Sequence, residues 1–227
     1  MDKSAIRNAA TVILQRSTPD GPAILVGQRG AKAAFMPNKF VFPGGAVDPA
    51  DGNIPLGSAL PAPCDSRLRE DGSVDPNALA TAAIRELWEE TGLILGTPAA
   101  WPDAPEDWHA FAAHGMRPHA AHLRFFFRAI TPPGRPRRFD ARFFLIDADH
   151  ISGDLDDFSA ASDELSHLHW VPLADVLTLD LPFITEVVLA EVARHPDPSQ
   201  APQTVPFFKN TDEESLFLRL NGAPLED

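Results

Sequence analysis

The sequence lacks the marks of several large classes of protein. It has one cysteine, Cys64, which excludes an internal disulfide framework and any CxxC metal site. No apolar run reaches the roughly 18 residues that cross a membrane, so we expect no membrane association. The segment from Met1 to Arg7 has no apolar stretch of the kind found in signal peptides. A reducing, cytoplasmic location is therefore expected.

Basic charge is also scarce. Lys and Arg number 19 against 32 Asp and Glu, which gives a formal net charge of -13. Such a chain has no general attraction for the phosphates of nucleic acids, and we expect no nucleic-acid partner. A small anionic ligand would need a local basic patch or a metal ion. The GxSxG, GxxxxGK[ST], HExxH and GxGxxG signatures of common catalytic and nucleotide sites are absent too.

The residues that are present predict a mixed α/β fold in one domain over residues 1–227. Apolar runs at 9–14 and 23–26 flank the turn residues Pro19, Asp20 and Gly21, a pattern typical of a β-hairpin. Further strands are expected at 40–42, 121–130, 142–146 and 168–173, and helices at 106–114 and 182–195. Strands on both sides of helical segments place the chain in the α/β class.

The strongest helix pattern ends in the stretch Arg-Glu-Leu-Trp-Glu-Glu-Thr-Gly-Leu at 85–93. Asp75 is expected to cap this helix, and Pro76 to occupy its first position. Gly92 is expected to end it. Apolar or uncharged residues recur at helical spacing and predict one buried face, made of Ala80, Ala83, Ile84, Leu87 and Thr91.

The acids of this helix form a second face. Glu86 lies three residues before Glu89 and four before Glu90, so the carboxylates are neighbours on the helix surface. Like charges at these spacings repel, and here they stand at the negative end of the helix dipole. A divalent cation such as Mg²⁺ would offset the repulsion, because it binds carboxylates together with substrate phosphates. A solvated acidic face is the alternative interpretation.

Arginines gather around one predicted turn of this acidic chain. The cluster consists of Arg124, Arg128, Arg135, Arg137, Arg138 and Arg142. The guanidinium group suits bidentate contacts with phosphate, so these residues are candidates for substrate binding. Pairing with the many Asp and Glu residues of the chain is the alternative.

Gly44-Gly45 and the stretch at 85–93 together resemble the signature of the Nudix hydrolases, in which a glycine and an acid precede REUxEExGU, with U an aliphatic residue. The resemblance covers about residues 9–195. It implies a Nudix-type α/β/α sandwich with a mixed β-sheet between helices. It also implies a Mg²⁺- or Mn²⁺-dependent hydrolase acting on the diphosphate linkage of a small nucleotide derivative.

The resemblance implies roles for residues of the acidic helix. Glu86, Glu89 and Glu90 are expected to bind the metal, together with the Gly45 carbonyl. Arg85 is expected to hold the acids in place by pairing with one of them. Arg85, Glu86 and Glu89 are therefore counted among the catalytic residues.

The general base and the phosphate contacts are implied less directly. The base is Glu86, which we favour, or Glu164, which matches an acidic loop residue used by ADP-ribose hydrolases. Arg29, Arg138 and Arg142 are expected to contact the phosphates of the substrate.

The first half of the signature departs from the family pattern. Asp51 stands where the family usually has Glu, and the segment from Asp51 to Arg85 is about 26 residues longer than the signature allows. Asn77 takes the same place when the count runs back from Arg85, and Asp48 is a third candidate. We expect an insertion at about 52–76, and a further loop and helix insertion at about 97–120.

Two segments resemble one branch of the family. Residues 42–48 read Phe-Pro-Gly-Gly-Ala-Val-Asp, and residues 137–144 read Arg-Arg-Phe-Asp-Ala-Arg-Phe-Phe. This branch includes the peroxisomal coenzyme A diphosphatases of eukaryotes, which implies coenzyme A or an acyl-coenzyme A as substrate. The final Pro-Leu-Glu-Asp is not a peroxisomal address. The alternatives are an ADP-ribose or NADH pyrophosphatase and a non-catalytic nucleotide-binding module. Homodimers are common in the family, so a homodimer is a further expectation.

Overall fold

A long hairpin starts the fold. β1 (Ile6–Thr18) and β2 (Gly21–Arg29) pair antiparallel, with Thr18 opposite Gly21, which confirms the predicted hairpin. The computed structural model describes residues 5–33, 35–70, 74–195, 197–211 and 213–220. Residues 1–4 and the final Pro-Leu-Glu-Asp, where we expect no targeting signal, lie outside the described residues, as do residues 71–73 of the predicted insertion.

The hairpin forms the centre of a mixed sheet. The main strand order is β11-β10-β7-β8-β1-β2-β3, with β4 beside β1 and β9 beside β2. β1 runs parallel to β8, and β10 runs parallel to β7. The remaining strands are β3 (Phe40–Val41), β4 (Gly44–Ala46), β7 (Arg124–Ile130), β8 (Arg138–Asp147), β9 (Leu165–Pro172), β10 (Pro206–Asn210) and β11 (Ser215–Arg219). The predicted strands are all present, and β8 begins four residues before its predicted start at 142.

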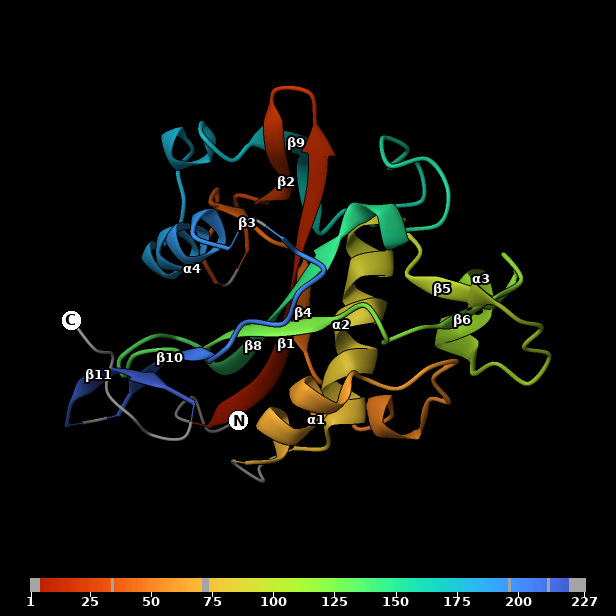
Figure 1. The fold of residues 1–227 in the computed structure, drawn as a ribbon, viewed down its shortest axis with the longest axis horizontal. Coiled ribbons are helices and arrows are strands. Elements are labelled where there is room, and N and C mark those ends of the chain that lie inside the picture. Colours follow the sequence, from red (N-terminus) through yellow and green to blue (C-terminus); the bar gives the residue numbers. More distant parts are fainter. Residues whose placement is uncertain (1–4, 34, 71–73, 196, 212, 221–227) are drawn as a thin grey trace.

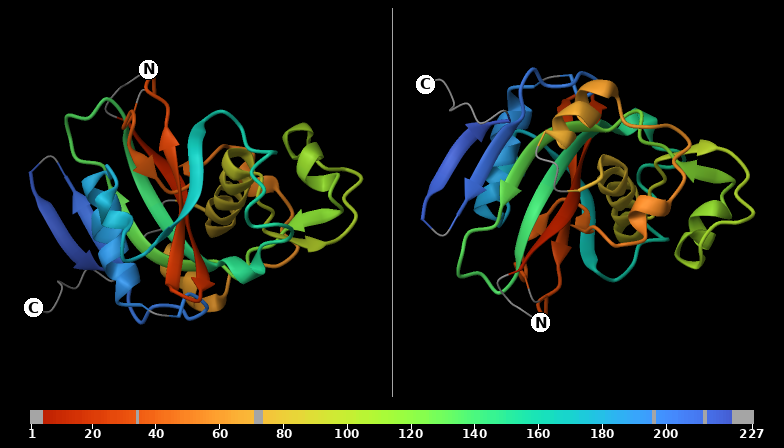
Figure 2. Two further views of the ribbon diagram at one scale, coloured as in Figure 1. Left: turned by 90° about the horizontal axis from the view of Figure 1, so that it is seen from above. Right: turned by 90° about the horizontal axis from the view of Figure 1, so that it is seen from below.

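Helices cover both faces of this sheet (Figures 1 and 2). α2 (Pro76–Thr91) packs on the face that carries Val12, and α4 (Phe183–Ala193) packs on the face that carries Ile13. Adjacent residues of a strand point to opposite faces, so the two helices lie on opposite sides of β1. The predicted α/β/α sandwich with a mixed sheet is confirmed.

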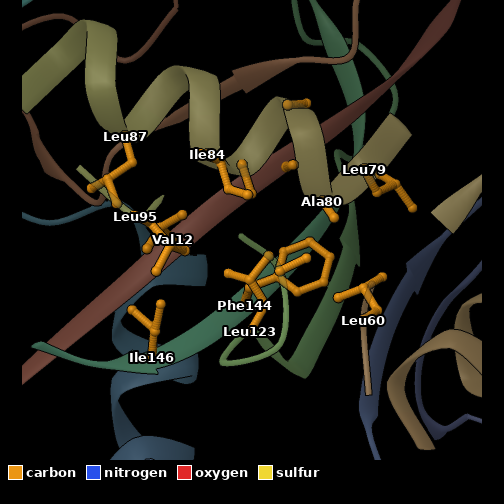
Figure 3. Close-up of a cluster of buried hydrophobic side chains, with 14 of the residues drawn as sticks. Val12, Leu60, Leu79, Ala80, Ile84, Leu87, Leu95, Leu123, Phe144 and Ile146 are labelled. Atoms are coloured by element: carbon orange, nitrogen blue, oxygen red, sulfur yellow. The ribbon is translucent and has the colours of Figure 1, made fainter. Parts of the chain in front are cut away.

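α2 follows the predicted cap residues. The Asp75 carboxylate accepts a hydrogen bond from the Asn77 N–H at 3.1 Å, and Pro76 is the first helical residue. Gly92 ends the helix with a φ of 74°, a left-handed conformation that favours glycine. The predicted buried face meets the sheet, where Ile84 and Leu87 pack near Val12 (Figure 3). This packing also fixes the direction of the face that carries the acids, which meets β4 at the side of the apolar contact.

The segment between Gly45 and α2 is more regular than its composition predicts. It contains a 3-10 helix, η1 (Asp51–Asn53), and a short helix, α1 (Ala62–Arg69). Two prolines are compatible with this helix. Pro61 precedes the first turn of α1 and Pro63 lies within that turn, where proline is tolerated. Cys64 and Leu68, one helical turn apart, are buried in the same core as α2.

A peripheral unit follows α2 in the chain and lies to one side of it (Figure 1). β5 (Gly96–Pro98) and β6 (Met116–Pro118) form a small antiparallel sheet, and η2 (Glu106–Trp108) and α3 (His109–Ala112) connect them. Trp88 of α2 holds this unit through an edge contact with Phe111 at 5.8 Å. Two further 3-10 helices are η3 (Ala148–His150) and η4 (Val176–Thr178). Among the described residues, no helix is long and apolar enough to cross a membrane.

Candidate active site

The acids of α2 lie against the strand that contains the glycine pair. The Gly44 N–H donates a hydrogen bond to Glu90 Oε2 at 2.7 Å. A Cβ placed on Gly45 would stand 2.4 Å from the carboxyl carbon of Glu86. Any larger residue at Gly45 would therefore push Glu86 away. The glycine pair lets the backbone of β4 approach the carboxylates closely.

Arg85 links these acids into one network. Its Nη1 donates to Glu86 Oε1 at 2.8 Å and to Glu89 Oε2 at 3.2 Å. Its Nε and Nη2 bind the two carboxylate oxygens of Asp51 at 3.0 and 3.1 Å. Nη2 also donates to the Ala46 carbonyl at 3.0 Å. We call Arg85, Asp51, Glu86 and Glu89 the Arg85 network. These bonds fix the guanidinium plane and hold Glu86 and Glu89 beside it.

Asp51, from the first half of the Nudix-like signature, is the acid that binds Arg85. Its side chain is 2% exposed, and its carboxylate also accepts the Asp48 N–H at 2.8 Å. The Asp48 carboxylate is 56% exposed and stands 3.8 Å from Arg85. Asn77 is exposed at the start of α2. Of the three candidates that the sequence left open, Asp51 therefore supports the network.

Burial destabilises the charged forms of the glutamates. It raises the pKa of Glu90 to about 8, although the Gly44 N–H bond acts in the opposite direction. It raises the pKa of Glu86 to about 7 against the opposing charge of Arg85, and it raises the pKa of half-buried Glu89 as well. The ion pairs with Asp51 and Glu86 hold the pKa of Arg85 above its usual value, although burial alone would lower it. A bound cation would favour the charged forms of these glutamates and so lower their pKa values.

The Arg85 network opens into a cavity of about 970 Å³. Glu86 and Glu89 line it at this end, and so does Glu164 from the loop that precedes β9. Arg29 and Lys39 line it as well. Within the described residues, the buried Nε of Arg29 has no hydrogen-bond partner, and the Arg29 charge acts on Glu90. The structure therefore brings Glu164 and Arg29 to the same site as the acids of α2.

Arg138 and Arg142 lie elsewhere. The Arg142 side chain is 2% exposed and binds Asn8 Oδ1 at 2.7 Å and Asp140 at 3.2 Å. Arg138 donates to the Thr131 and Asn210 carbonyls at 3.0 and 3.3 Å. Neither residue lines the cavity. Their placement supports intraprotein pairing, the alternative left open for the arginine cluster, rather than the phosphate contact that we expected.

The cavity contains basic residues that the sequence did not single out as site residues. Arg7, Arg135 and Arg137 line it together with residues of β1, β8 and α4. Arg135 and Arg137 were visible as members of the arginine cluster, but nothing in the sequence fixed which members turn inward. Arg7 gave no signal, because it stands alone in the sequence near the start of β1.

The protein is an α/β/α sandwich in which the glutamates of α2 face the glycine pair of β4. This combination of fold and site is the one expected of a Nudix hydrolase. Comparisons agree with this class. The NUDIX hydrolase from Alicyclobacillus acidocaldarius matches with a TM-score of 0.66 and 28% identity, over 87% of this chain and 97% of that chain. The NUDIX domain of Shewanella oneidensis NrtR, determined with ADP ribose, shares the fold with a TM-score of 0.50 and 13% identity, over 85% and 89% of the chains.

Curated relatives lead to the same family. The putative nudix hydrolase 7 of Caenorhabditis elegans is 30% identical over 181 residues, which are 74% of this chain and 52% of the relative. Acyl-coenzyme A diphosphatase NUDT19 of Gallus gallus is 34% identical over 128 residues, 42% of this chain and 34% of the relative. The matches thus span about half and about a third of these two relatives. No protein-family model matches the chain. The chain belongs to the Nudix hydrolase family.

The residues of the site suit a divalent cation in chemistry. Glu86, Glu89 and Glu90 offer carboxylate oxygens, the ligands that Mg²⁺ and Mn²⁺ prefer, and Gly45 offers a backbone carbonyl. Among the described side chains, no group of three acids, histidines or thiols already has the arrangement of a metal site. Instead, the Arg85 guanidinium group donates hydrogen bonds to the carboxylates of Glu86 and Glu89. The donor set therefore fits, and cation binding would require these two carboxylates to turn partly from Arg85.

The raised pKa values predict a pH-dependent response to metal. Glu86 and Glu90 keep their protons to about pH 7 and pH 8 in the folded protein, whereas the unfolded chain releases them near its ordinary pKa of about 4.3. The stability of the metal-free protein therefore falls as pH rises through this window. Metal binding needs ionised carboxylates. Saturating Mg²⁺ or Mn²⁺ is thus expected to raise Tm by roughly 5–10 °C at about pH 8.5 and by clearly less at about pH 6.

Differential scanning fluorimetry with and without metal, at matched ionic strength, measures this effect. Glu106→Gln removes an exposed carboxylate in the peripheral unit, and this control should retain the full metal response. An equal rise in Tm at both pH values would contradict the assignment of the response to the buried glutamates.

Proposed function

We propose that this protein hydrolyses the diphosphate linkage of a nucleoside diphosphate derivative, and that coenzyme A or an acyl-coenzyme A is its substrate. The observation that carries the proposal is the Arg85 network with its glutamates, placed at one end of a cavity of about 970 Å³. Nudix hydrolases act on small nucleotide derivatives. Relatives named acyl-coenzyme A diphosphatase, at 33% and 34% identity, favour the coenzyme A class.

Each residue of the site has a role in this proposal. Glu86, Glu89 and Glu90 would hold Mg²⁺ or Mn²⁺ together with the Gly45 carbonyl. The bound ion would neutralise charge on the diphosphate and activate the attacking water. Arg85 is itself held by Asp51 and by the Ala46 carbonyl, and it would orient Glu86 and Glu89 as they turn toward the ion.

Two contacts complete the proposed reaction. Arg29 lines the cavity and its charge acts on Glu90, so its guanidinium group would bind a phosphate oxygen. The proton of the attacking water passes to Glu86 or to Glu164, both of which line the cavity. We keep Glu86, which belongs to the signature helix, as the favoured base.

The exposed position of Glu164 on the same cavity favours a second candidate function. An acid on this loop is the feature of the sequence that resembles ADP-ribose hydrolases, and here it faces the glutamates of α2. An ADP-ribose or NADH pyrophosphatase is therefore the alternative substrate class. The cytoplasmic location and the homodimer stay predictions.

A substrate screen tests the proposal. Coenzyme A, acetyl-coenzyme A, ADP-ribose, NADH and diadenosine polyphosphates would be incubated with Mg²⁺, with Mn²⁺ and with a chelator, and the products separated by chromatography. Metal-dependent release of 4′-phosphopantetheine from coenzyme A, faster than hydrolysis of ADP-ribose, is the expected result. Preferential cleavage of ADP-ribose or NADH would establish the alternative. Binding without hydrolysis of any substrate would identify a non-catalytic module.

A further inference from the structure

The part of the cavity away from the glutamates has a floor formed by strands β1, β7 and β8. Three pairs of residues stand opposite each other on the neighbouring strands β1 and β8. They are Arg7 with Phe139, Ala9 with Ala141, and Thr11 with Phe143. These residues all line the cavity, on the face of the sheet that α4 covers. Ala129 of β7 stands opposite Ala141, so three alanines lie side by side on three neighbouring strands. Small side chains on adjacent strands leave room above the sheet for a planar group.

Aromatic rings stand around this floor. Phe139 meets Phe35 edge-on at 5.4 Å, and Phe183 meets Phe208 at 6.2 Å. All four rings line the cavity, and the Phe183 residue is 66% exposed although it is large and apolar. An exposed aromatic ring beside this floor is suited to stacking against a nucleobase, because every base has an apolar face.

Positive charge lies at the far end of the floor. Arg7, Arg135 and Arg137 line the cavity, and no hydrogen bond or ion pair joins their side chains to the described residues. Other arginines of this chain do pair with acids: Arg128 binds Asp140 at 2.7 Å, and Arg16 binds Asp156 at 3.0 Å. In a chain with a net charge of -13, unpaired arginines around a cavity are available for an anionic ligand.

The distance between the two ends matches a nucleoside. Thr11 stands opposite Gly44, whose N–H binds Glu90. Arg7 lies four residues earlier on the same strand, which is about 13 Å along β1 at about 3.3 Å per residue. Because this is a separation between backbone positions, the Arg7 side chain covers part of it, and a ribose that carries phosphates at two positions can span the rest. An anion at Arg7, Arg135 and Arg137 is therefore a different phosphate from the diphosphate at the glutamates.

We propose that this end of the cavity, which we call the arginine end, binds the nucleotide half of the substrate and selects nucleotides that carry an additional phosphate monoester on the ribose. The inference rests on the proposed function, because it assumes that the scissile diphosphate lies at the glutamates. Coenzyme A carries such a monoester, whereas ADP-ribose and NADH do not. The arginine end thus favours the coenzyme A class over the alternative by charge.

Calorimetric titration of the metal-free protein with two nucleotides tests the inference. Adenosine 3′,5′-bisphosphate carries the additional phosphate and 5′-AMP lacks it, and neither contains a diphosphate that can be hydrolysed. The bisphosphate is expected to bind at least tenfold more tightly. In Arg135→Gln/Arg137→Gln this preference should fall below threefold. Arg194→Gln, which removes the same kind of charge from the exposed end of α4, should retain the full preference.

The outcomes separate this inference from the proposed function. Equal affinity for the two nucleotides in the unaltered protein would overturn the inference and leave the aromatic floor to an apolar part of the substrate. A preference that survives in Arg135→Gln/Arg137→Gln would overturn it as well, because the additional phosphate would then bind elsewhere. A preference that depends on these arginines, combined with no hydrolysis in the substrate screen, would sustain the inference and refute the proposed activity.

Discussion

Glu90→Gln is expected to lower kcat/KM for the diphosphate substrate by roughly 10³-fold while leaving the fold intact. The Gln side-chain carbonyl can still accept the Gly44 N–H, which Glu90 Oε2 accepts at 2.7 Å, so the packing of α2 against β4 should persist. The variant lacks the negative charge that would hold the metal. Loss of about 4 kcal/mol of charge stabilisation in the transition state corresponds to that factor.

Steady-state kinetics with the best substrate of the screen would measure this loss, and thermal unfolding without metal would verify the fold. Burial raises the pKa of Glu90 to about 8, so a neutral amide should leave the metal-free protein at least as stable at neutral pH. Glu106→Gln, in the peripheral unit, should keep full activity. Activity within threefold of the unaltered protein for Glu90→Gln would refute its assignment as a metal ligand.

Local signals were sufficient to predict the helix that carries the acids. Asp75, Pro76 and Gly92 act within one turn of the ends of α2, through a side-chain cap, a fixed φ and a left-handed φ. The buried face followed from helical spacing alone, and Ile84 and Leu87 are fully buried. α1 was missed because it is short and rich in charged residues, and its formation depends on burying Cys64 and Leu68 against the core of α2.

The positions of the arginine side chains relative to the cavity could not be predicted from the sequence. Side chains alternate along β8, so Phe139, Ala141 and Phe143 share one face and Arg138 and Arg142 share the other. The sequence does not reveal which face holds the cavity, because that depends on the parallel pairing of β8 with β1 and on the position of α4. The choice of Asp51 over Asp48 and Asn77 likewise depends on tertiary contact, since only the folded chain brings Asp51 to Arg85.

Arg85→Met is expected to lower the free energy of unfolding by about 3–5 kcal/mol, the usual cost of removing one partner from a buried ion-pair network. Arg85 serves three carboxylates at once, and its side chain is 10% exposed. Asp51 would lose both of its bonds to the guanidinium group and keep the Asp48 N–H. Urea unfolding followed by circular dichroism would measure the change. Arg69→Met breaks the exposed pair with Asp65 and should cost about 1 kcal/mol or less.

Two further variants separate charge from geometry in the Arg85 network. Arg85→Lys keeps the charge, but an ammonium group cannot bind both oxygens of Asp51 and reach Glu86 as the planar guanidinium does. It should recover less than half of the lost stability. Asp51→Asn in the Arg85→Met background removes the buried charge that lost its partner, and it should restore part of the stability, with a coupling energy of about 1–3 kcal/mol. Additive effects of the two substitutions would show that Asp51 and Arg85 act independently, contrary to a network that holds the glutamates in place.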